Sequence, residues 1–155
     1  PKILVASEHT DPAFFADQLV NVIEGKESVD GWKQDEKGLT GKDFSGLYII
    51  TKHDGLPLKK ILQTKIPKII HFSITGLGGT IWEPGVMRYN DLLDRIEEYI
   101  KQGLDPKWIT VRIDPIIPGI TSAKDIEEIM RRCSEMGIKR IKFSICDMYA
   151  GGIRK

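Results

Sequence analysis

Strand signals and helix signals alternate along this chain of 155 residues, and the alternation limits the folds open to it. Short apolar runs that predict strands occur at 2–9, 47–53, 68–76, 108–117 and 141–147. Helical patterns lie between them, at 12–25, 57–63, 87–103 and 122–137. Repeated strand and helix units of this length predict parallel strands joined by right-handed crossovers. We therefore expect an α/β fold, a partial (β/α) barrel of about five parallel strands with helices on the outer face.

The predicted helices carry recognisable end signals. Asp11 and Pro12 supply an N-cap and a first-turn proline for the first helix. Ser122 and Asp125 stand at capping-box spacing at the start of the last one. The stretch 26–46 is rich in Gly, Lys, Asp and Glu, which predicts an irregular surface excursion.

Length and charge exclude several classes of protein. A complete eight-unit barrel needs roughly 200 residues or more, so residues 1–155 are expected to form one partial-barrel domain, on its own or as the N-terminal part of a longer protein. The net charge is +1, which provides no strong field to attract nucleic acid. No apolar run approaches the roughly 20 residues that cross a bilayer, so no membrane partner is expected. Only two cysteines are present, which fits a cytoplasmic protein.

The strand at 108–117 has one apolar and one polar face. Side chains alternate along a strand, so Arg112 and Asp114 share a face opposite Val111 and Ile113. The strands before and after it alternate in the same way. A parallel sheet covered by helices on both sides would be almost continuously apolar. The polar face is therefore either open to solvent or, as we expect, the lining of a concave cavity.

Polar residues also gather where the predicted strands end. Ligands of open α/β sheets and barrels bind at the carboxyl ends of the strands, so a small-molecule ligand is expected there. The candidate residues at these ends, besides Arg112 and Asp114, are Glu8, His9, Lys52, His53, Ser73, Thr75, Ser144 and Asp147.

Arg112 and Asp114 are the strongest candidates for binding. A guanidinium fixed on a strand can hold a carboxylate or phosphate through two hydrogen bonds, and a nearby aspartate can orient it. A structural salt bridge would look the same in the sequence, so both interpretations stay open. The loop TGLGGT (75–80) could wrap an anion, but it matches neither the P-loop nor the dinucleotide fingerprint, and an ordinary turn is favoured.

Two other chemistries are weaker alternatives. Glu8, His9 and His53 could hold a divalent metal, but they are spread over two strand ends, and cavity-rim residues are the favoured interpretation. No metal site is predicted. Lys52 or Lys142 could form a Schiff base in a small aldolase or lyase-type barrel, although no neighbouring residue singles either out.

Several motifs resemble a known superfamily. HFSITGLGG, WEPGV and VRIDPIIPG, in this order, resemble the middle of radical S-adenosylmethionine enzymes of the spore photoproduct lyase type. ASEHTDPAFF and YIITKH resemble an uncharacterised related branch whose cysteine cluster lies near the C-terminus. The resemblance covers about residues 2–149, and RIDPIIPG is its most specific piece.

The resemblance implies a lyase-like or DNA-repair-photolyase-like domain of unknown substrate. Its partial barrel would bind S-adenosylmethionine beside an iron-sulfur cluster, and nucleic acid is suggested as a partner only by analogy with the lyase. By position, the resemblance places Ser73, Thr75, Arg112 and Asp114 along the cofactor or substrate cavity, and alternation adds Ser144.

The chain departs from the superfamily in its cysteines. The cluster is held by three closely spaced cysteines, whereas this sequence has only Cys133 and Cys146. Either the cysteines belong to a C-terminal part outside this chain, or the protein is a cluster-free relative that binds a ligand or a partner. In the second case it would be a non-catalytic binding or assembly module, pairing through an exposed last strand.

Overall fold

The computed structural model describes residues 2–6, 11–31, 34–53 and 56–146. Five strands form one sheet in the order of the chain, and each neighbouring pair is parallel, as the sequence predicts. The strands are β1 (Lys2–Ala6), β2 (Phe44–Thr51), β3 (Lys68–Ser73), β4 (Ile109–Ile116) and β5 (Ile141–Ile145).

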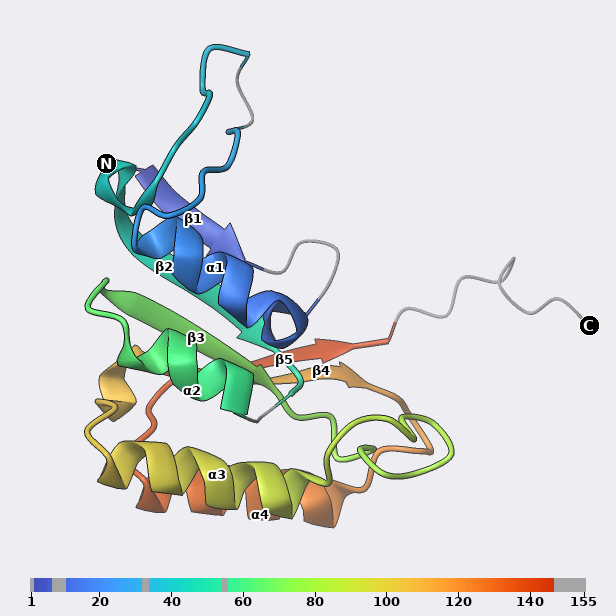
Figure 1. Ribbon diagram of the computed structural model, residues 1–155. Helices are drawn as coiled ribbons and strands as arrows, with labels where there is room; N and C mark the ends of the chain where they lie inside the picture. Colours follow the sequence, from blue (N-terminus) through green and yellow to red (C-terminus); the bar gives the residue numbers. More distant parts are fainter. Residues whose placement is uncertain (1, 7–10, 32–33, 54–55, 147–155) are drawn as a thin grey trace, which may run out of the picture.

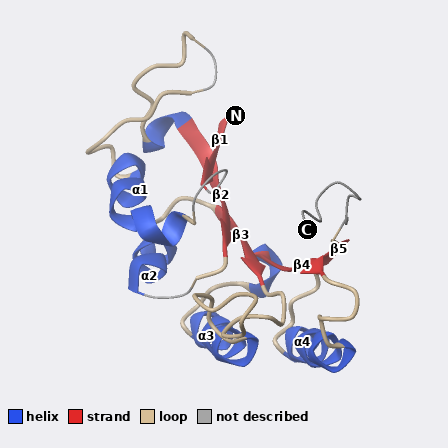
Figure 2. Cartoon of the chain, turned by 90° about the vertical axis from the view of Figure 1, so that its right-hand side faces the viewer, coloured by secondary structure: helices blue, strands red, loops and turns tan. Residues whose placement is uncertain are grey.

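Four α-helices lie on one side of this sheet, outside its curve (Figure 1, Figure 2). They are α1 (Ala16–Ile23), α2 (Leu56–Gln63), α3 (Tyr89–Lys101) and α4 (Ala123–Glu135). Short 3-10 helices occur at η1 (Pro12–Phe15), η2 (Gly41–Asp43) and η3 (Pro106–Trp108). No helix of the described residues covers the other, inner side of the sheet.

The core fills the space between the sheet and these helices. Fully buried side chains on the strands include Ile49, Phe72 and Ile113, and they pack with Leu93 of α3 and Ile129 of α4. Burying a side chain of this size stabilises the fold by about 1.5–3 kcal/mol. The apolar alternation of the strands therefore accounts for the one-sided arrangement of the helices.

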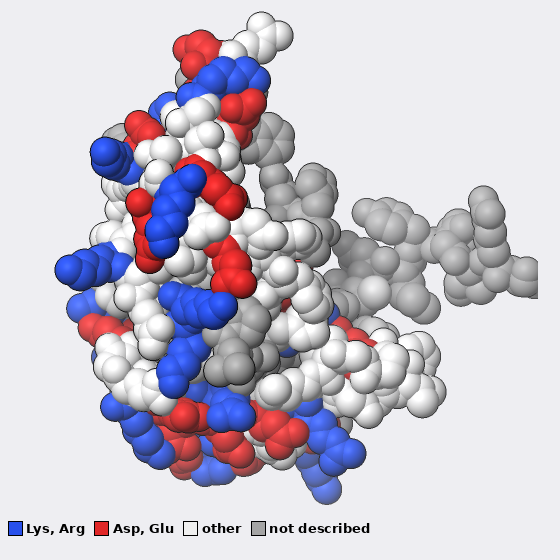
Figure 3. Space-filling model, in the orientation of Figure 1, with Lys and Arg blue, Asp and Glu red and all other residues white. Residues whose placement is uncertain are grey.

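Charged side chains of both signs cover the outer surface of α3 (Figure 3). Lys101 pairs with Glu97 on α3, and Arg131 pairs with Glu128 and Glu135 on α4. These pairs are three or four residues apart, the spacing that places side chains next to each other on a helix. The two signs are interspersed there, so this surface presents no single-sign patch.

The excursion at 26–46 is more ordered than predicted. Val29 and Leu39 form an isolated antiparallel bridge, with backbone hydrogen bonds of 2.9 and 2.8 Å. β2 begins at Phe44, opposite Lys2, which is three residues earlier than the apolar run indicates. The sequence did not predict this start, because the polar residues before Leu47 give no strand pattern. Pairing with β1 determines where β2 begins.

Candidate functional site

The inner face of the sheet carries the polar side chains that alternation predicts. Arg112 and Asp114 are half-buried there, while Val111 and Ile113 are fully buried on the helix side. In register across the sheet, Ser73 of β3 pairs with Arg112. Arg112 in turn stands in register with Lys142 of β5. One continuous polar row thus crosses three strands.

Asp114 connects β4 to β5 through two hydrogen bonds. Its carboxylate accepts one from a guanidinium Nη2 of Arg112 and one from the hydroxyl of Ser144. The Ser144 hydrogen bond, followed by the hydrogen bond and charge of Arg112, lowers the pKa of Asp114 below its ordinary value, and Lys52 adds to this. Asp114 is therefore ionised at neutral pH.

Arg112 keeps one donor free. Its Nε atom is buried and has no hydrogen-bond partner among the described residues. An unpaired buried donor costs free energy, so an acceptor supplied by a ligand would be favoured at this position.

A second polar cluster centres on Glu83, which lies in the loop between β3 and α3. Its carboxylate accepts hydrogen bonds from the Nζ of Lys52 and the hydroxyl of Thr75, at the ends of β2 and β3. The contribution of Lys52 to the pKa of Asp114 connects the two clusters electrostatically. Sequence reasoning missed Glu83, because a loop residue belongs to no alternating pattern. The WEPGV motif was the available signal.

The glycine loop at 75–80 positions Glu83. The Gly79 amide donates to the Glu83 carbonyl over 3.0 Å, and Gly78 forms an isolated bridge with Glu83. A Cβ atom at Gly78 would collide with the carbonyl oxygen of Met87, so the close approach of the two chain segments requires glycine. This supports the ordinary-turn interpretation of TGLGGT.

His71 lies on the same face, two residues before Ser73 on β3 and in register with Thr110 of β4. Its ring is 4.6 Å from that of Tyr48, centroid to centroid, and its Nδ1 is 3.3 Å from the Tyr48 hydroxyl. Burial lowers the pKa of His71 to about 4, and the charges of Lys142, Arg112 and Arg140 act in the same direction. His71 is therefore neutral at pH 7.

The remaining candidates fall into two groups. The ring of His53 packs edge-on against that of Phe14 of η1, with 4.9 Å between the ring centroids. Glu8, His9 and Asp147 lie outside the described residues. The structure therefore brings together one set of predicted residues at the carboxyl edge: Lys52, Ser73, Thr75, Arg112, Asp114 and Ser144.

The cysteines do not fit an iron-sulfur cluster. Cys133 on α4 is completely buried in the core, and burial raises the pKa of its thiol to about 11. Cys146 follows β5, where its amide donates to the Ile116 carbonyl over 2.8 Å. A cluster needs deprotonated thiolates gathered at one place, and these two cannot supply three. The described residues also contain no group of three His, Cys, Asp or Glu that could hold a metal ion.

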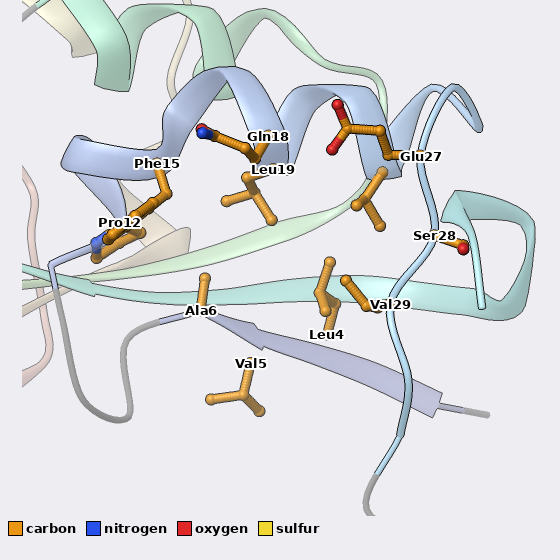
Figure 4. Close-up of a pocket in the computed structure, with 11 residues that line it drawn as sticks. Leu4, Val5, Ala6, Pro12, Phe15, Gln18, Leu19, Glu27, Ser28 and Val29 are labelled. Carbon is orange, nitrogen blue, oxygen red and sulfur yellow. The ribbon is translucent and has the colours of Figure 1, made fainter. Parts of the chain in front are cut away.

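A separate groove of about 300 Å³ lies on the helix side of β1 (Figure 4). Its walls are mostly apolar and come from β1, α1 and the segment at 27–29, and Glu27 is the charged residue in its lining. The Glu27 carboxylate accepts a 2.9 Å hydrogen bond from Asn21. Such walls suit an apolar occupant, so the ionic inner face is the better candidate site for a polar ligand.

No helix in the described part of the chain is long and apolar enough to cross a bilayer. Comparisons with protein-family models, with curated proteins and with solved structures give no match. The resemblance to radical S-adenosylmethionine enzymes therefore rests on the sequence motifs alone.

Proposed function

We propose that this protein is a partial-barrel domain of the radical S-adenosylmethionine-like type, whose inner face binds a small molecule with a carboxylate and an ammonium group. The observation that carries the proposal is the Arg112, Asp114 and Ser144 cluster, in which the buried Nε of Arg112 has no partner among the residues that the structure describes. S-adenosylmethionine is the ligand that the motif resemblance suggests, and its amino-acid portion has both groups.

Each end of such a ligand has a complementary residue on this face. Arg112 offers its free Nε to a carboxylate, which would relieve the unpaired donor. Asp114 is held ionised and can accept a hydrogen bond from an ammonium group. Glu83 supplies a second carboxylate on the loop side of the site.

The proposal covers binding and assigns no radical step. The thiol of Cys133 is completely buried in the core. The superfamily's chemistry requires a site with three thiolates, and this chain has only two cysteines. Lys52 is not proposed as a Schiff-base nucleophile, because its ammonium group is paired with Glu83.

Isothermal titration calorimetry with S-adenosylmethionine tests the proposal. Arg112→Ala should weaken binding by roughly tenfold or more, because it removes a charged hydrogen-bond donor from a half-buried site. Arg131→Ala is the matched control, since it removes an exposed arginine with two ion pairs on α4, and it should leave binding unchanged.

A truncated ligand separates the role of the amino-acid portion from that of the rest. 5′-Methylthioadenosine lacks this portion, so wild type should bind it more weakly than S-adenosylmethionine, and Arg112→Ala should show a smaller difference between the two, because Asp114 still accepts from the ammonium group. If wild type fails to bind S-adenosylmethionine, or Arg112→Ala binds it as tightly as wild type, the proposal is wrong.

A further inference from the structure

β5 presents apolar side chains at the edge of the sheet. Phe143 is 50% exposed and Ile145 is 66% exposed, although Phe143 stands in register with the fully buried Ile113 of β4. Residues in register share a face, so Phe143 lies on the helix side of the sheet, where no helix of the described residues covers it. β4 pairs with one edge of β5, and the other edge is unpaired within the described part of the chain.

The sequence of β5 is symmetric about its middle residue. In IKFSI, Ile141 and Ile145 stand two positions on either side of Phe143, and Lys142 and Ser144 stand between them. An antiparallel pair of β5 strands related by a twofold axis at Phe143 places Phe143 opposite itself and Ile141 opposite Ile145. The exposed apolar side chains of each copy then cover those of the other.

The polar side chains are compatible in the same arrangement, because a carboxylate of β4 lies beside the serine that would face each lysine. On the inner face, Lys142 of one copy stands opposite Ser144 of the second copy, and Ser144 donates a hydrogen bond to Asp114. The lysine ammonium therefore approaches a serine hydroxyl bonded to an ionised carboxylate. No like charges face each other across this pair of strands, a condition that favours strand pairing.

We propose that the protein forms a twofold-symmetric dimer through antiparallel pairing of β5 with β5 of a second copy. The two sheets join into one, with the apolar residues of both β5 strands on the side that carries the helices. This proposal rests on the edge strand and is independent of ligand binding at Arg112.

Light scattering coupled to size-exclusion chromatography, run over a range of protein concentrations, tests the dimer. Wild type should approach twice the 17.5 kDa of one chain as concentration rises. Phe143→Asp places two carboxylates against each other at the axis and removes apolar contact, so it should weaken dimerisation by roughly tenfold or more. Circular dichroism should report an unchanged fold, because Phe143 is half-exposed.

Ile81→Asp is the matched control, because Ile81 is an apolar residue that is 89% exposed and lies in the loop before α3. It should dimerise like wild type. A wild type that stays monomeric at every concentration, or a Phe143→Asp variant that dimerises as well as wild type, overturns the proposal.

Disulfide trapping tests the geometry. Opposed residues of antiparallel strands have Cα atoms about 4.5–5.5 Å apart, within reach of a disulfide. Phe143→Cys in a Cys146→Ser background should therefore form a covalent dimer under mild oxidation. Val5→Cys with Ile145→Cys in the same background examines pairing of β5 with β1 instead. Dimers trapped only by this second pair would overturn the antiparallel arrangement.

Discussion

His71 is a buried imidazole on the inner face. It contacts Tyr48, and the charges of Lys142, Arg112 and Arg140 act on it. An unfolded histidine titrates near pH 6.5, whereas the pKa of His71 in the folded chain is about 4. Between these values the unfolded chain binds the proton more readily than the folded one. The stability that neutral His71 provides is therefore complete above about pH 6.5 and is lost as the pH falls toward 4.

We predict that His71→Gln makes the free energy of unfolding depend less on pH below pH 7. Between pH 7 and about pH 4.5, wild type should lose about 2 kcal/mol more of its free energy of unfolding than the variant does. Urea unfolding followed by circular dichroism at both pH values measures this difference. Equal losses in the two proteins would contradict the assignment of a low pKa to His71.

At the scale of elements, Asp11 ties the start of the first helical segment to the end of β2. Its carboxylate accepts hydrogen bonds from the Ala13 amide over 3.0 Å, the Thr51 hydroxyl over 2.7 Å and the Lys52 amide over 2.6 Å. One side chain therefore caps η1 and also fixes the strand end that carries Lys52 toward Glu83.

Asp11→Ala should lower the free energy of unfolding by about 1–3 kcal/mol, because it leaves the Ala13 and Lys52 amides without this acceptor and leaves the Thr51 hydroxyl with the His53 carbonyl alone. Asp105→Ala is the control. Asp105 caps η3 through the Lys107 amide and pairs with the Lys107 ammonium group near the surface, so its loss should cost less than about 1 kcal/mol. Chemical denaturation of both variants gives the comparison, and equal costs would refute the tie between η1 and β2.

Periodicity explains which elements the sequence predicts well. The helix patterns at 87–103 and 122–137 enclose α3 and α4, because their apolar positions face the core. Alternation likewise places Arg112 and Asp114 on one face. The role of Glu83 escapes such reasoning, since its contacts with Lys52 and Thr75 join loop and strand ends that are distant in sequence. The early start of β2 was missed for a related reason, because it depends on pairing with β1.

In the described part of the molecule, one layer of helices packs on one sheet, and Cys133 is buried in the core between them. Ile129 and Cys133 are both completely buried on the side of α4 that faces the strands. Reagents reach the Cys133 thiol only when α4 separates from the sheet, so its reactivity reports the opening of the core.

In native protein, Ellman's reagent should label Cys146, which is partly exposed, and leave Cys133 unmodified. The Cys146→Ser variant should then show almost no reaction until urea unfolds it, because the remaining thiol is buried and its pKa is raised to about 11. Labelling rates across a urea series measure this. Rapid labelling of Cys146→Ser without urea would mean that α4 does not stay packed.

The contacts of Glu83 have a consequence for any ligand of the inner face. Its carboxylate already accepts hydrogen bonds from Lys52 and Thr75, the donors that a bound anion would use. A ligand carboxylate that approached Lys52 would have to displace Glu83, whereas one that approached the free Nε of Arg112 would not. In the proposed complex, the loop at 75–88 would therefore compete with an anionic ligand for Lys52, and the affinity of the inner face for anions would depend on how firmly that loop is held.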